Sequence, residues 1–248
     1  MSSKKKFLGI IPARKGSKGI KNKNLTLLDN KPLIQYTLEA AEKSRLLDFT
    51  IVTTDDTAVM DLSRKFNVKI PFRRPEHLAT DTASSLDVVL HALEYLEVNE
   101  GYVPDYVVLL QPTCPLRDEH DIDSSIQQYL EESKEYGIEC LISVNIPSEH
   151  PYDCIRIEGH DMKLAFEESK KCCGRQSFSQ FYFMNGAIYI TPVDTLRKKG
   201  LFFDKEEKNS FYVMHQSRSI DIDEIFDLKV AESLLQTGNV IKNMEGME

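Results

Sequence analysis

The sequence predicts an α/β fold built around a doubly wound, mainly parallel sheet. Short apolar runs alternate with amphipathic stretches along most of the 248 residues, which is the pattern of strands that alternate with helices. The first run, residues 7–11 (FLGII), is almost continuously apolar, as expected for a strand that is covered on both faces. The sequence has no internal repeat and no low-complexity linker, so we expect a single domain over residues 1–248.

The individual elements are predicted from starting residues and apolar patterns. Pro32 opens a helix that runs to about Ser44, because proline is tolerated in the first helical turn. Residues 82–96 carry Leu86, Val89 and Leu93 on one helical face. The other expected helices are 57–66, 118–130 and 224–235, and the other expected strands are 49–53, 106–110, 140–144, 187–190 and 211–214.

The alternation of strands and helices breaks between about residues 147 and 183. This stretch mixes Tyr, Phe, Cys and charged residues and has no long helical periodicity. It is typical of an insertion, and we expect a small excursion from the main domain here.

Charge is distributed unevenly along the chain. There are 31 Lys and Arg against 39 Asp and Glu, for a formal net charge of −8. The first 28 residues carry eight cations and no acid, so the remainder carries −16 (23 basic against 39 acidic residues). A protein that coats nucleic acid extends positive charge over a whole face, whereas this acidic body would repel a polyanion. A compact cation cluster on an acidic body is better suited to one small anion.

The sequence also argues against a membrane-spanning or secreted protein. Its longest apolar runs are about five residues, against the roughly 20 that a helix needs to cross a bilayer. The opening KKKFLGIIP has too short an apolar stretch for a signal peptide and no small-residue cleavage site. Five cysteines without a CxxC pair do not suggest a disulfide framework or a zinc site. We therefore expect a cytoplasmic protein with chemically inert thiols.

The cation cluster follows the first strand, where open α/β sheets bind ligands. Residues 12–24 (PARKGSKGIKNKN) hold five cations and two glycines, and the glycines allow backbone N–H groups to approach phosphate oxygens. The spacing fits neither the Walker loop nor the dinucleotide fingerprint. GSKG matches the GXXG clamp of RNA-binding KH modules, but a strand precedes it where that module needs a helix. A solvated, Lys-rich surface loop is the alternative.

Five motifs together resemble one family. IPARKGSKGIKNKN, RRPEHLATDTASS, LLQPTCPLR, MNGAIYI and SIDIDEIFDL are similar, in this order, to motifs of the CMP-sialic acid synthetases (acylneuraminate cytidylyltransferases), and the resemblance covers roughly residues 6–235. It implies a Rossmann-like nucleotidyltransferase fold and a homodimer. It also implies transfer of CMP from CTP to a nine-carbon 2-keto sugar acid, N-acetylneuraminic acid or a relative, with release of pyrophosphate. The implied cofactor is Mg²⁺, with Mn²⁺ as a possible substitute.

Asp-Ile-Asp occurs twice. Asp121 and Asp123 lie near the start of an expected helix, where acids stabilise the helix dipole without any ligand. Asp221 and Asp223 follow an expected strand, and alternation places both carboxylates on one side, where hard oxygens can hold Mg²⁺. The resemblance implies that the second pair is the metal site.

The resemblance also assigns residues to the nucleotide. It implies catalytic roles for Arg14 and Lys23, which would neutralise phosphate charge, and for Asp223. In Arg73-Arg74-Pro75 it directs Arg74 to the nucleotide and leaves Arg73 on the surface. The implied nucleotide-binding residues are Ala13, Arg14, Lys23, Asn24, Arg74, Ala83 and Ser85.

Two of these stretches also have an ordinary structural explanation. In Thr54-Asp55-Asp56 we expect Asp56 or Thr57 to cap the following helix. Residues 81–85 (DTASS) come directly before another expected helix, so at least one of their hydroxyls should act as a cap.

Gln111 closes an expected strand, so its amide lies in the cleft, where it can bind sugar hydroxyls. Related enzymes for the eight-carbon acid KDO have an acidic metal ligand near this point, and its absence here argues against KDO. The role of Arg117 has two interpretations: it binds a substrate carboxylate, or it pairs with Asp118 and Glu119. Cys114 stands where the family commonly has Ser, and we expect a small packing change without thiol chemistry.

For the sugar acid, the resemblance implies Gln111, Arg175, Gln176, Asn185, Phe202 and Phe203. Arg175 lies in the excursion, which in the family crosses to the dimer partner, so it serves either its own or the neighbouring site. Core packing is the alternative for the two Phe rings. Many sialate members carry a basic residue where this chain has Phe183, and relatives that activate legionaminic acid have an apolar one, so legionaminic or another nonulosonic acid stays open.

Three further functions were weighed against this one. A nucleotidyltransferase of related fold could act on another sugar acid. A nucleic-acid-binding module would use the basic head and GSKG, but the acidic body argues against it. A catalytically silent nucleotide sensor would bind CTP without depending on Asp221 and Asp223.

Overall fold

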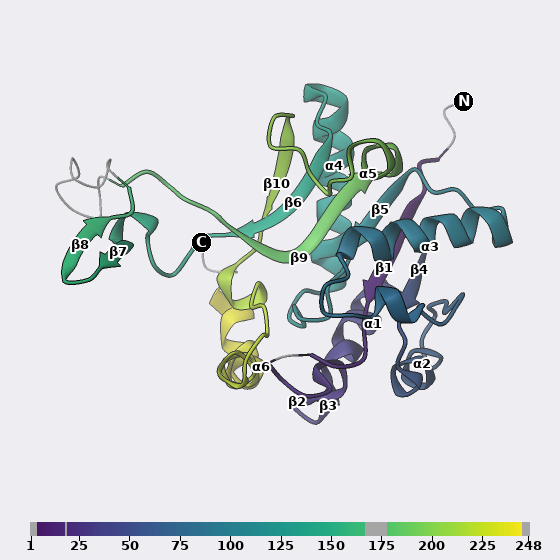
Figure 1. Ribbon diagram of the computed structural model, residues 1–248, viewed down its shortest axis with the longest axis horizontal. Coiled ribbons are helices and arrows are strands. Elements are labelled where there is room, and N and C mark those ends of the chain that lie inside the picture. The colour runs from purple at the N-terminus through teal and green to yellow at the C-terminus, as the bar shows by residue number, and fades with distance from the viewer. Residues whose placement is uncertain (1–3, 18, 167–177, 245–248) are drawn as a thin grey trace.

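A central sheet of six strands organises the residues that the computed structural model describes, which are 4–17, 19–166 and 178–244. The strand order is β10-β6-β9-β5-β1-β4 (Figure 1). Neighbours are parallel except at β9, which is antiparallel to both β5 and β6. The strands are β1 (Phe7–Pro12), β4 (Phe49–Thr53), β5 (Tyr106–Leu109), β6 (Cys140–Asn145), β9 (Phe183–Pro192) and β10 (Asn209–Val213).

Helices cover both faces of this sheet, which confirms the expected doubly wound α/β fold. Two short antiparallel pairs lie outside it: β2 (Leu27–Leu28) with β3 (Lys31–Pro32), and β7 (Ile155–Glu158) with β8 (Asp161–Leu164). The helices are α1 (Leu33–Lys43), α2 (Thr57–Ser63), α3 (Ser85–Glu100), α4 (Glu119–Tyr136), α5 (Val193–Lys199) and α6 (Ile225–Met244).

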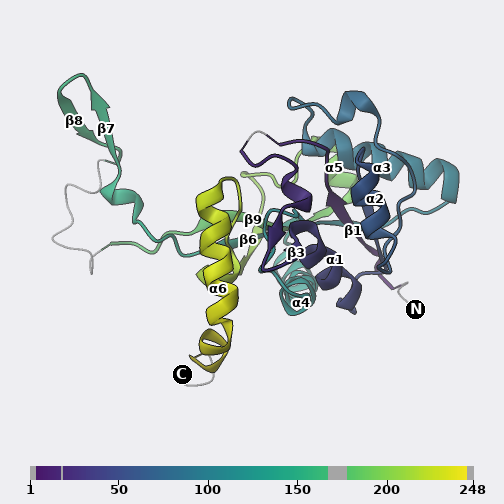
Figure 2. The same ribbon diagram turned by 90° about the horizontal axis from the view of Figure 1, so that it is seen from below.

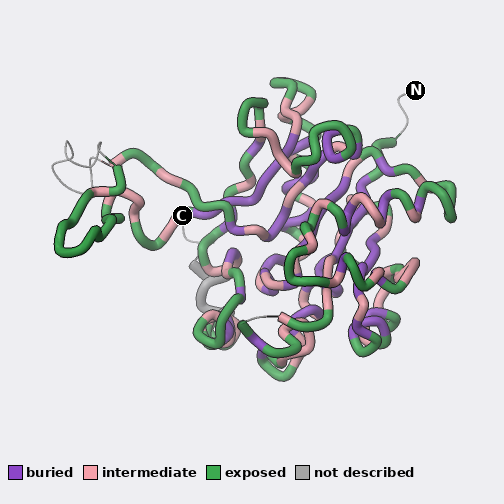
Figure 3. The backbone as a smooth tube through the Cα atoms, viewed as in Figure 1, coloured by how far each residue is buried: buried purple, intermediate pink, exposed green. Residues whose placement is uncertain are grey.

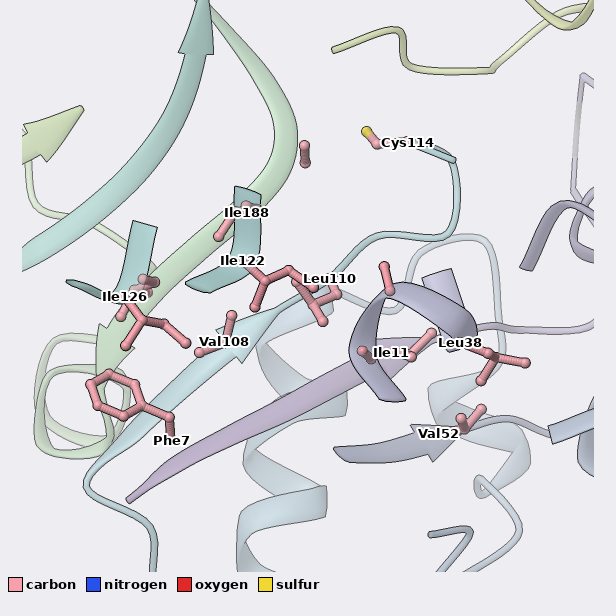
Figure 4. Close-up of a cluster of buried hydrophobic side chains, with 14 of the residues drawn as sticks. Phe7, Ile11, Leu38, Val52, Val108, Leu110, Cys114, Ile122, Ile126 and Ile188 are labelled. Atoms are coloured by element: carbon pink, nitrogen blue, oxygen red, sulfur yellow. The ribbon is translucent and has the colours of Figure 1, made fainter. Parts of the chain in front are cut away.

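The continuous apolar run of β1 reflects its central place. Phe7 and Ile11 pack on one face with residues of α1 and α4 (Figure 4), while Leu8 and Ile10 pack on the other face with α3 and α5. All four side chains are at most 2% exposed. Each such burial contributes roughly 1.5–3 kcal/mol, so these two layers fix the strand whose end carries the cation cluster.

Helix starts follow the predicted chemistry. The Asp56 carboxylate accepts from Ala58 N and caps α2, which confirms the capping prediction for that stretch. Ser84 caps α3 by accepting from Asp87 N. Asp118 caps α4 within a capping box that Asp121 completes. These local caps hold the loops at the carboxyl edge of the sheet in place.

A third apolar cluster joins two distant parts of the sequence. Ile20, from the loop after β1, is 5% exposed, and Ile222, just before α6, is fully buried. Both pack with Leu28, Leu33 and Leu228. This cluster brings residues 13–24 and 221–223 together.

The excursion leaves the sheet as an arm, defined here as residues 146–166 and 178–182. Both Figure 1 and Figure 2 show it reaching away from the sheet, with the β7–β8 hairpin at its tip. The hairpin is almost entirely exposed (Figure 3). At the base of the arm, the ring of His150 packs against Tyr152, Phe178 and Phe181 at centroid distances of 4.4–5.1 Å.

Several predicted boundaries were wrong. The strand expected at 187–190 is the longer β9, and the helix expected at 118–130 continues to Tyr136, where Gly137 in the left-handed region ends it. The α5 helix, both short strand pairs and the antiparallel direction of β9 were not predicted. None of the helices in the described ranges has the length and apolar character that a bilayer crossing requires.

Candidate active site

The cation loop, residues 13–17 and 19–24 as described, leaves the end of β1 and is braced by its own polar side chains. Asn24 donates its amide to Arg14 O at 3.0 Å. Ser17 donates to Ile20 O at 2.6 Å and accepts from Lys23 N at 3.3 Å. These bonds brace the loop, although two of its cations, Lys15 and Lys21, are exposed.

The acidic segment, residues 221–223, lies outside any helix or strand and does not directly follow a strand as predicted. Strand β10 ends at Val213, and a 3-10 turn at Gln216–Arg218 intervenes because His215 accepts from Ser217 N and starts a new turn. The alternation itself holds: Ile222 is buried and donates its N–H to Thr113 O at 2.8 Å, whereas Asp221 and Asp223 are exposed.

The cation loop and the acidic segment meet directly. Lys23 Nζ lies 2.9 Å from both Ile222 O and Asp223 Oδ1. A Cβ on Gly19 would come within 2.1 Å of Asp223 O, so only glycine permits this approach. Gly19, Ile20 and Lys23 thus bring the cation loop into contact with the acidic segment, about 200 positions later in the sequence.

The acidic segment has the character of a cation site. The surrounding protein desolvates the Asp221 carboxylate and, with the charge of Asp223, raises its pKa above the ordinary value. Two hard oxygen donors that repel each other fit one divalent cation. In the described part of the chain, no group of three or more His, Cys, Asp or Glu side chains forms a metal cluster. The two carboxylates therefore need further oxygen donors, such as phosphates or water.

A second positive region lies across the loop, at the end of β4. Arg74 is 4% exposed and donates to Thr53 Oγ1 at 3.1 Å and to Thr53 O at 2.5 Å. Burial, together with the nearby charge of Arg14, lowers the pKa of Arg74 to about 10, while Asp55 opposes the shift. Arg14 forms an ion pair with Asp81 at 2.6 Å.

The backbone around this region is also fixed. Ala13 N donates to Thr53 O at 3.0 Å, and Lys15 N donates to Asp55 Oδ1 at 2.6 Å. Arg73 is exposed, as expected. The ends of β1 and β4 therefore present two guanidinium groups to one side of the cation loop.

The nucleotide residues expected on α3 lie at its first turn. Ser84, which was not assigned to the nucleotide, forms two hydrogen bonds with Asp87. Its hydroxyl donates to Asp87 Oδ2 and accepts from Asp87 N. Ser85 is exposed and lines a pocket, and Ala83 is half-buried, with its N–H on Thr80 O at 3.3 Å.

This pocket, which we call the Gln111 pocket, encloses about 610 Å³. Gln111 lies at the carboxyl end of β5, where the amide was expected. Leu109, Tyr189, Phe202 and Phe203 give the pocket apolar walls. The complete lining is Ser85, Leu109, Gln111, Tyr189, Gly200, Leu201, Phe202, Phe203, Asp204, Lys205 and Glu206.

The pocket lies within electrostatic reach of the acidic segment. The pKa of Tyr189 is raised by burial and, more weakly, by the charges of Cys114 and Asp221. Thr113, two residues after Gln111, accepts the N–H of Ile222. The short stretch from Gln111 to Thr113 therefore connects the pocket to the acidic segment.

Asn185 does not lie in the pocket, although we expected it to contact the sugar. It is 2% exposed, and its Oδ1 accepts from Ser143 Oγ at 2.6 Å and from Ala187 N at 3.1 Å. These contacts point the amide into the interior, where it supports β9. Arg175 and Gln176 lie outside the described residues.

The structure also decides the secondary expectations. Arg117 is 1% exposed and forms no ion pair with Asp118 or Glu119 among the described contacts. The expected pairing with these two acids is therefore wrong. Cys114 is fully buried, and burial raises the pKa of its thiol to about 12, as expected for a packing residue without thiol chemistry.

Sequence reasoning named Phe202 and Phe203 but missed the other residues of the pocket wall, which runs over residues 200–206. Lys199 anchors this wall, because its Nζ lies 2.9–3.3 Å from carboxylate oxygens of Glu139, Asp204 and Glu207. Gly200, in the left-handed region, ends α5 and turns the chain towards the pocket. The Lys-Gly pair was the available signal, but a seven-residue helix was too short to be recognised.

Comparison with known proteins places this architecture in a family. The family model described as Cytidylyltransferase matches residues 8–243. The chain belongs to the cytidylyltransferase family. The resemblance that the five motifs carried is confirmed at this level.

Individual relatives agree with this assignment. N-acylneuraminate cytidylyltransferase of Escherichia coli is 34% identical over 94% of this chain, which spans only 53% of that relative. CMP-N,N'-diacetyllegionaminic acid synthase of Legionella pneumophila is 30% identical, with 93% of this chain and 97% of the relative covered. The solved structure of CMP:2-keto-3-deoxy-manno-octonic acid synthetase complexed with CTP shares the fold at a TM-score of 0.68 and 16% identity, covering 94% of this chain and 99% of that one.

Proposed function

We propose that this chain transfers CMP from CTP to a nine-carbon 2-keto sugar acid and releases pyrophosphate. The observation that carries the proposal is the meeting of the cation loop with the acidic segment, where Lys23 Nζ lies 2.9 Å from Asp223 Oδ1. Phosphate chemistry needs this pairing of cations with metal-binding carboxylates, and the Gln111 pocket beside it offers room for an acceptor. The names of the relatives are consistent with this reaction.

In this proposal the cation loop binds the triphosphate. Arg14 and Lys23 neutralise the charge that grows on the α-phosphate and on the leaving pyrophosphate. Ala13 and Asn24 fix the loop backbone, and Arg74, which is held against the end of β4 by Thr53, adds positive charge. Ala83 and Ser85, at the start of α3, supply backbone and hydroxyl contacts for the cytosine and ribose.

Asp221 and Asp223 would hold Mg²⁺, with Mn²⁺ as a substitute. Such an ion would supply Lewis-acid stabilisation of phosphate charge. In the structure, the Lys23 ammonium neutralises Asp223.

The acceptor would occupy the Gln111 pocket. Gln111 would bind sugar hydroxyls, and the Phe202 and Phe203 rings would pack against an N-acyl methyl group. The anomeric 2-hydroxyl then attacks the α-phosphorus in line, so that a new O–P bond forms as the bond to the pyrophosphate oxygen breaks. Arg175 and Gln176 remain proposed sugar ligands, and Asn185 supports the wall from the interior.

Legionaminic acid is the second candidate for the acceptor. Where many sialate enzymes carry a basic residue, this chain has Phe183, which is 61% exposed beside the equally apolar Met184. An exposed apolar pair favours a sugar with an additional apolar substituent, as in a diacetylated nonulosonic acid.

We further propose a homodimer in the cytoplasm, where CTP is available. The arm exposes Ile155, Ile157, Met162 and Phe166 at 39–71%. A hairpin of four-residue strands cannot bury these side chains alone, because two isolated strands lack a core. A second copy of the chain would cover them.

The test is pyrophosphate release from CTP and Mg²⁺ with N-acetylneuraminic, legionaminic, pseudaminic and KDO acids in separate reactions. We expect release with at least one nine-carbon acid and none with KDO. No pyrophosphate release with any of the acids, from a protein that still binds CTP, would contradict the proposed transfer and favour a nucleotide sensor.

A further inference from the structure

Arg117 is among the largest fully buried side chains of the described residues and is not accounted for by the site above. Its Nη1 donates to Ala187 O at 2.8 Å and to Gln111 O at 3.3 Å, and its Nη2 donates to Thr37 Oγ1 at 2.8 Å. Nε is buried without a hydrogen-bond partner. Among the described residues, no carboxylate lies within ion-pair distance of the guanidinium.

Burying a cation without a direct counter-ion is costly, so the position calls for an explanation. Burial lowers the pKa of Arg117 to about 10, although nearby Cys114, Asp121 and Asp118 oppose that shift. An apolar side chain would fill the same space at lower cost. The three acceptors come from α1, β9 and the turn after β5, and only a guanidinium supplies enough N–H donors to bind all of them from this position.

The geometry of the sheet shows what these contacts do. Strands β5 and β9 pair as far as Leu109 and Tyr189, and beyond this register their ladder ends. The carbonyls of Gln111 and Ala187 lie just past that point, and one Arg117 nitrogen binds both. The guanidinium therefore ties the two strands together at the place where they diverge to form the pocket.

The polar end of the pocket depends on the same peptides. The Gln111 amide nitrogen lies 3.6 Å from the point that a Cβ on Gly186 would occupy, so the amide rests against Gly186 of β9, which precedes Ala187. Gly186 has φ +75°, a conformation that other residues rarely adopt. Both supports of the Gln111 side chain, its own peptide and Gly186, are thus adjacent to carbonyls that Arg117 binds.

We propose that Arg117 is a positioning residue that fixes the Gln111 amide for recognition of the sugar acid. This inference rests on the proposed function and deepens it, because it separates acceptor binding from CTP binding. Arg117 contacts neither the cation loop nor the acidic segment, so its loss should leave CTP binding intact.

The test compares Arg117→Met, Arg117→Lys and the control Thr37→Val. Arg117→Met removes all three donors while filling the space, and should raise KM for the accepted sugar acid about 10-fold or more, with KM for CTP within about twofold. Arg117→Lys retains one ammonium and should recover part of that loss. Thr37→Val removes only the contact to α1 and should change neither KM by more than about twofold.

A double-mutant cycle with Gln111→Ala decides whether Arg117 acts through Gln111. We expect Arg117→Met to have little further effect once Gln111 is Ala. Full additivity of the two effects, or an equal rise in both KM values, would overturn the inference.

Amide hydrogen exchange supplies a readout that needs no substrate. In Arg117→Met, the segments 110–112 and 185–188 should exchange at least about 10-fold faster, with β1 and β4 unchanged. Unchanged exchange in both segments would refute the positioning role whether or not any sugar acid is accepted. If the proposed reaction is wrong, the wild type releases no pyrophosphate with any sugar acid, while Arg117→Met still shows faster amide exchange in the two segments.

Discussion

The two Asp-Ile-Asp sequences of this chain fold into opposite environments. In the first, Asp121 is 1% exposed and accepts from Asp118 N and Tyr212 OH, and Asp123 accepts from Ser44 Oγ, Arg45 N and Leu46 N. In the second, Asp221 and Asp223 are exposed, and the side-chain donor nearest to Asp223 is the Lys23 ammonium.

The difference teaches that the surroundings decide the role of a carboxylate pair. The first pair lies within the opening turns of α4, where backbone N–H groups and hydroxyls use its oxygens. The second pair lies outside any helix, with the intervening Ile222 buried, so both carboxylates are exposed and keep oxygen capacity for a ligand. The same three residues are structural at one site and available for chemistry at the other.

The largest expected effect concerns the second pair. Asp221→Asn and Asp223→Asn should each lower pyrophosphate release from CTP by roughly 1,000-fold or more, because each removes a charged metal ligand. Steady-state kinetics with saturating Mg²⁺ measures this, with circular dichroism to check the fold. A loss below about 10-fold would break the distinction between the two pairs.

Lys23 comes next in size. Lys23→Ala should reduce turnover by roughly 100-fold or more with the fold intact, because one cation that faces the phosphates is lost. Lys21→Ala is the matched control, since Lys21 is an exposed cation of the same loop. Near-normal turnover of Lys23→Ala, or an equal loss in Lys21→Ala, would refute the role of Lys23.

The first pair should show the reverse pattern. Asp123→Ala leaves three donors at the end of α1 without their acceptor and should lower the free energy of unfolding by about 1–2 kcal/mol. In a chain of this size that is a fall in Tm of about 2–8 °C. Its kcat/KM at 25 °C should stay within about twofold of the wild type, and a larger loss would mean that the two pairs are coupled.

The smallest effect sharpens the comparison through pH. Because the pKa of Asp221 is raised in the folded protein, its ionisation opposes folding, and stability from this group declines as pH rises through that pKa. Asp221→Asn should therefore be slightly more stable than the wild type at pH 7 without metal, and the gain should disappear at pH values below the ordinary Asp range. Denaturant unfolding at pH 7 and pH 3.5 measures it, and a loss of stability at pH 7 would contradict the assigned desolvation.

Much of the fold was predictable because burial leaves a pattern in the sequence. The central strands were located within one or two residues, since β1, β4 and β5 are largely buried and mostly apolar. The hairpin β7–β8 was not, because side chains that pack against nothing in the chain carry no such pattern. The direction of β9 also had no local signal, as it depends on how the arm returns to the sheet.

The candidate site was predictable where single residues carry the chemistry. Lys23 and Asp223 were named from charge, spacing and resemblance, and they lie in contact. Asn185 and Arg117 were not understood, because their roles depend on which backbone groups face them once β5 and β9 have paired. Polar residues that bind the protein interior look the same in sequence as those that bind a ligand.

The central claim is that the cation loop and the second Asp pair form one metal-dependent CTP site. Calorimetric titration of CTP with Mg²⁺, and again with EDTA in its place, tests this most directly. For the wild type and for Asp123→Ala, we expect affinity at least about 10-fold tighter with Mg²⁺, a difference of about 1.4 kcal/mol. In Asp221→Asn/Asp223→Asn the difference should vanish. Equal affinity with and without Mg²⁺ in the wild type, or a metal effect that survives the loss of both carboxylates, would contradict the claim.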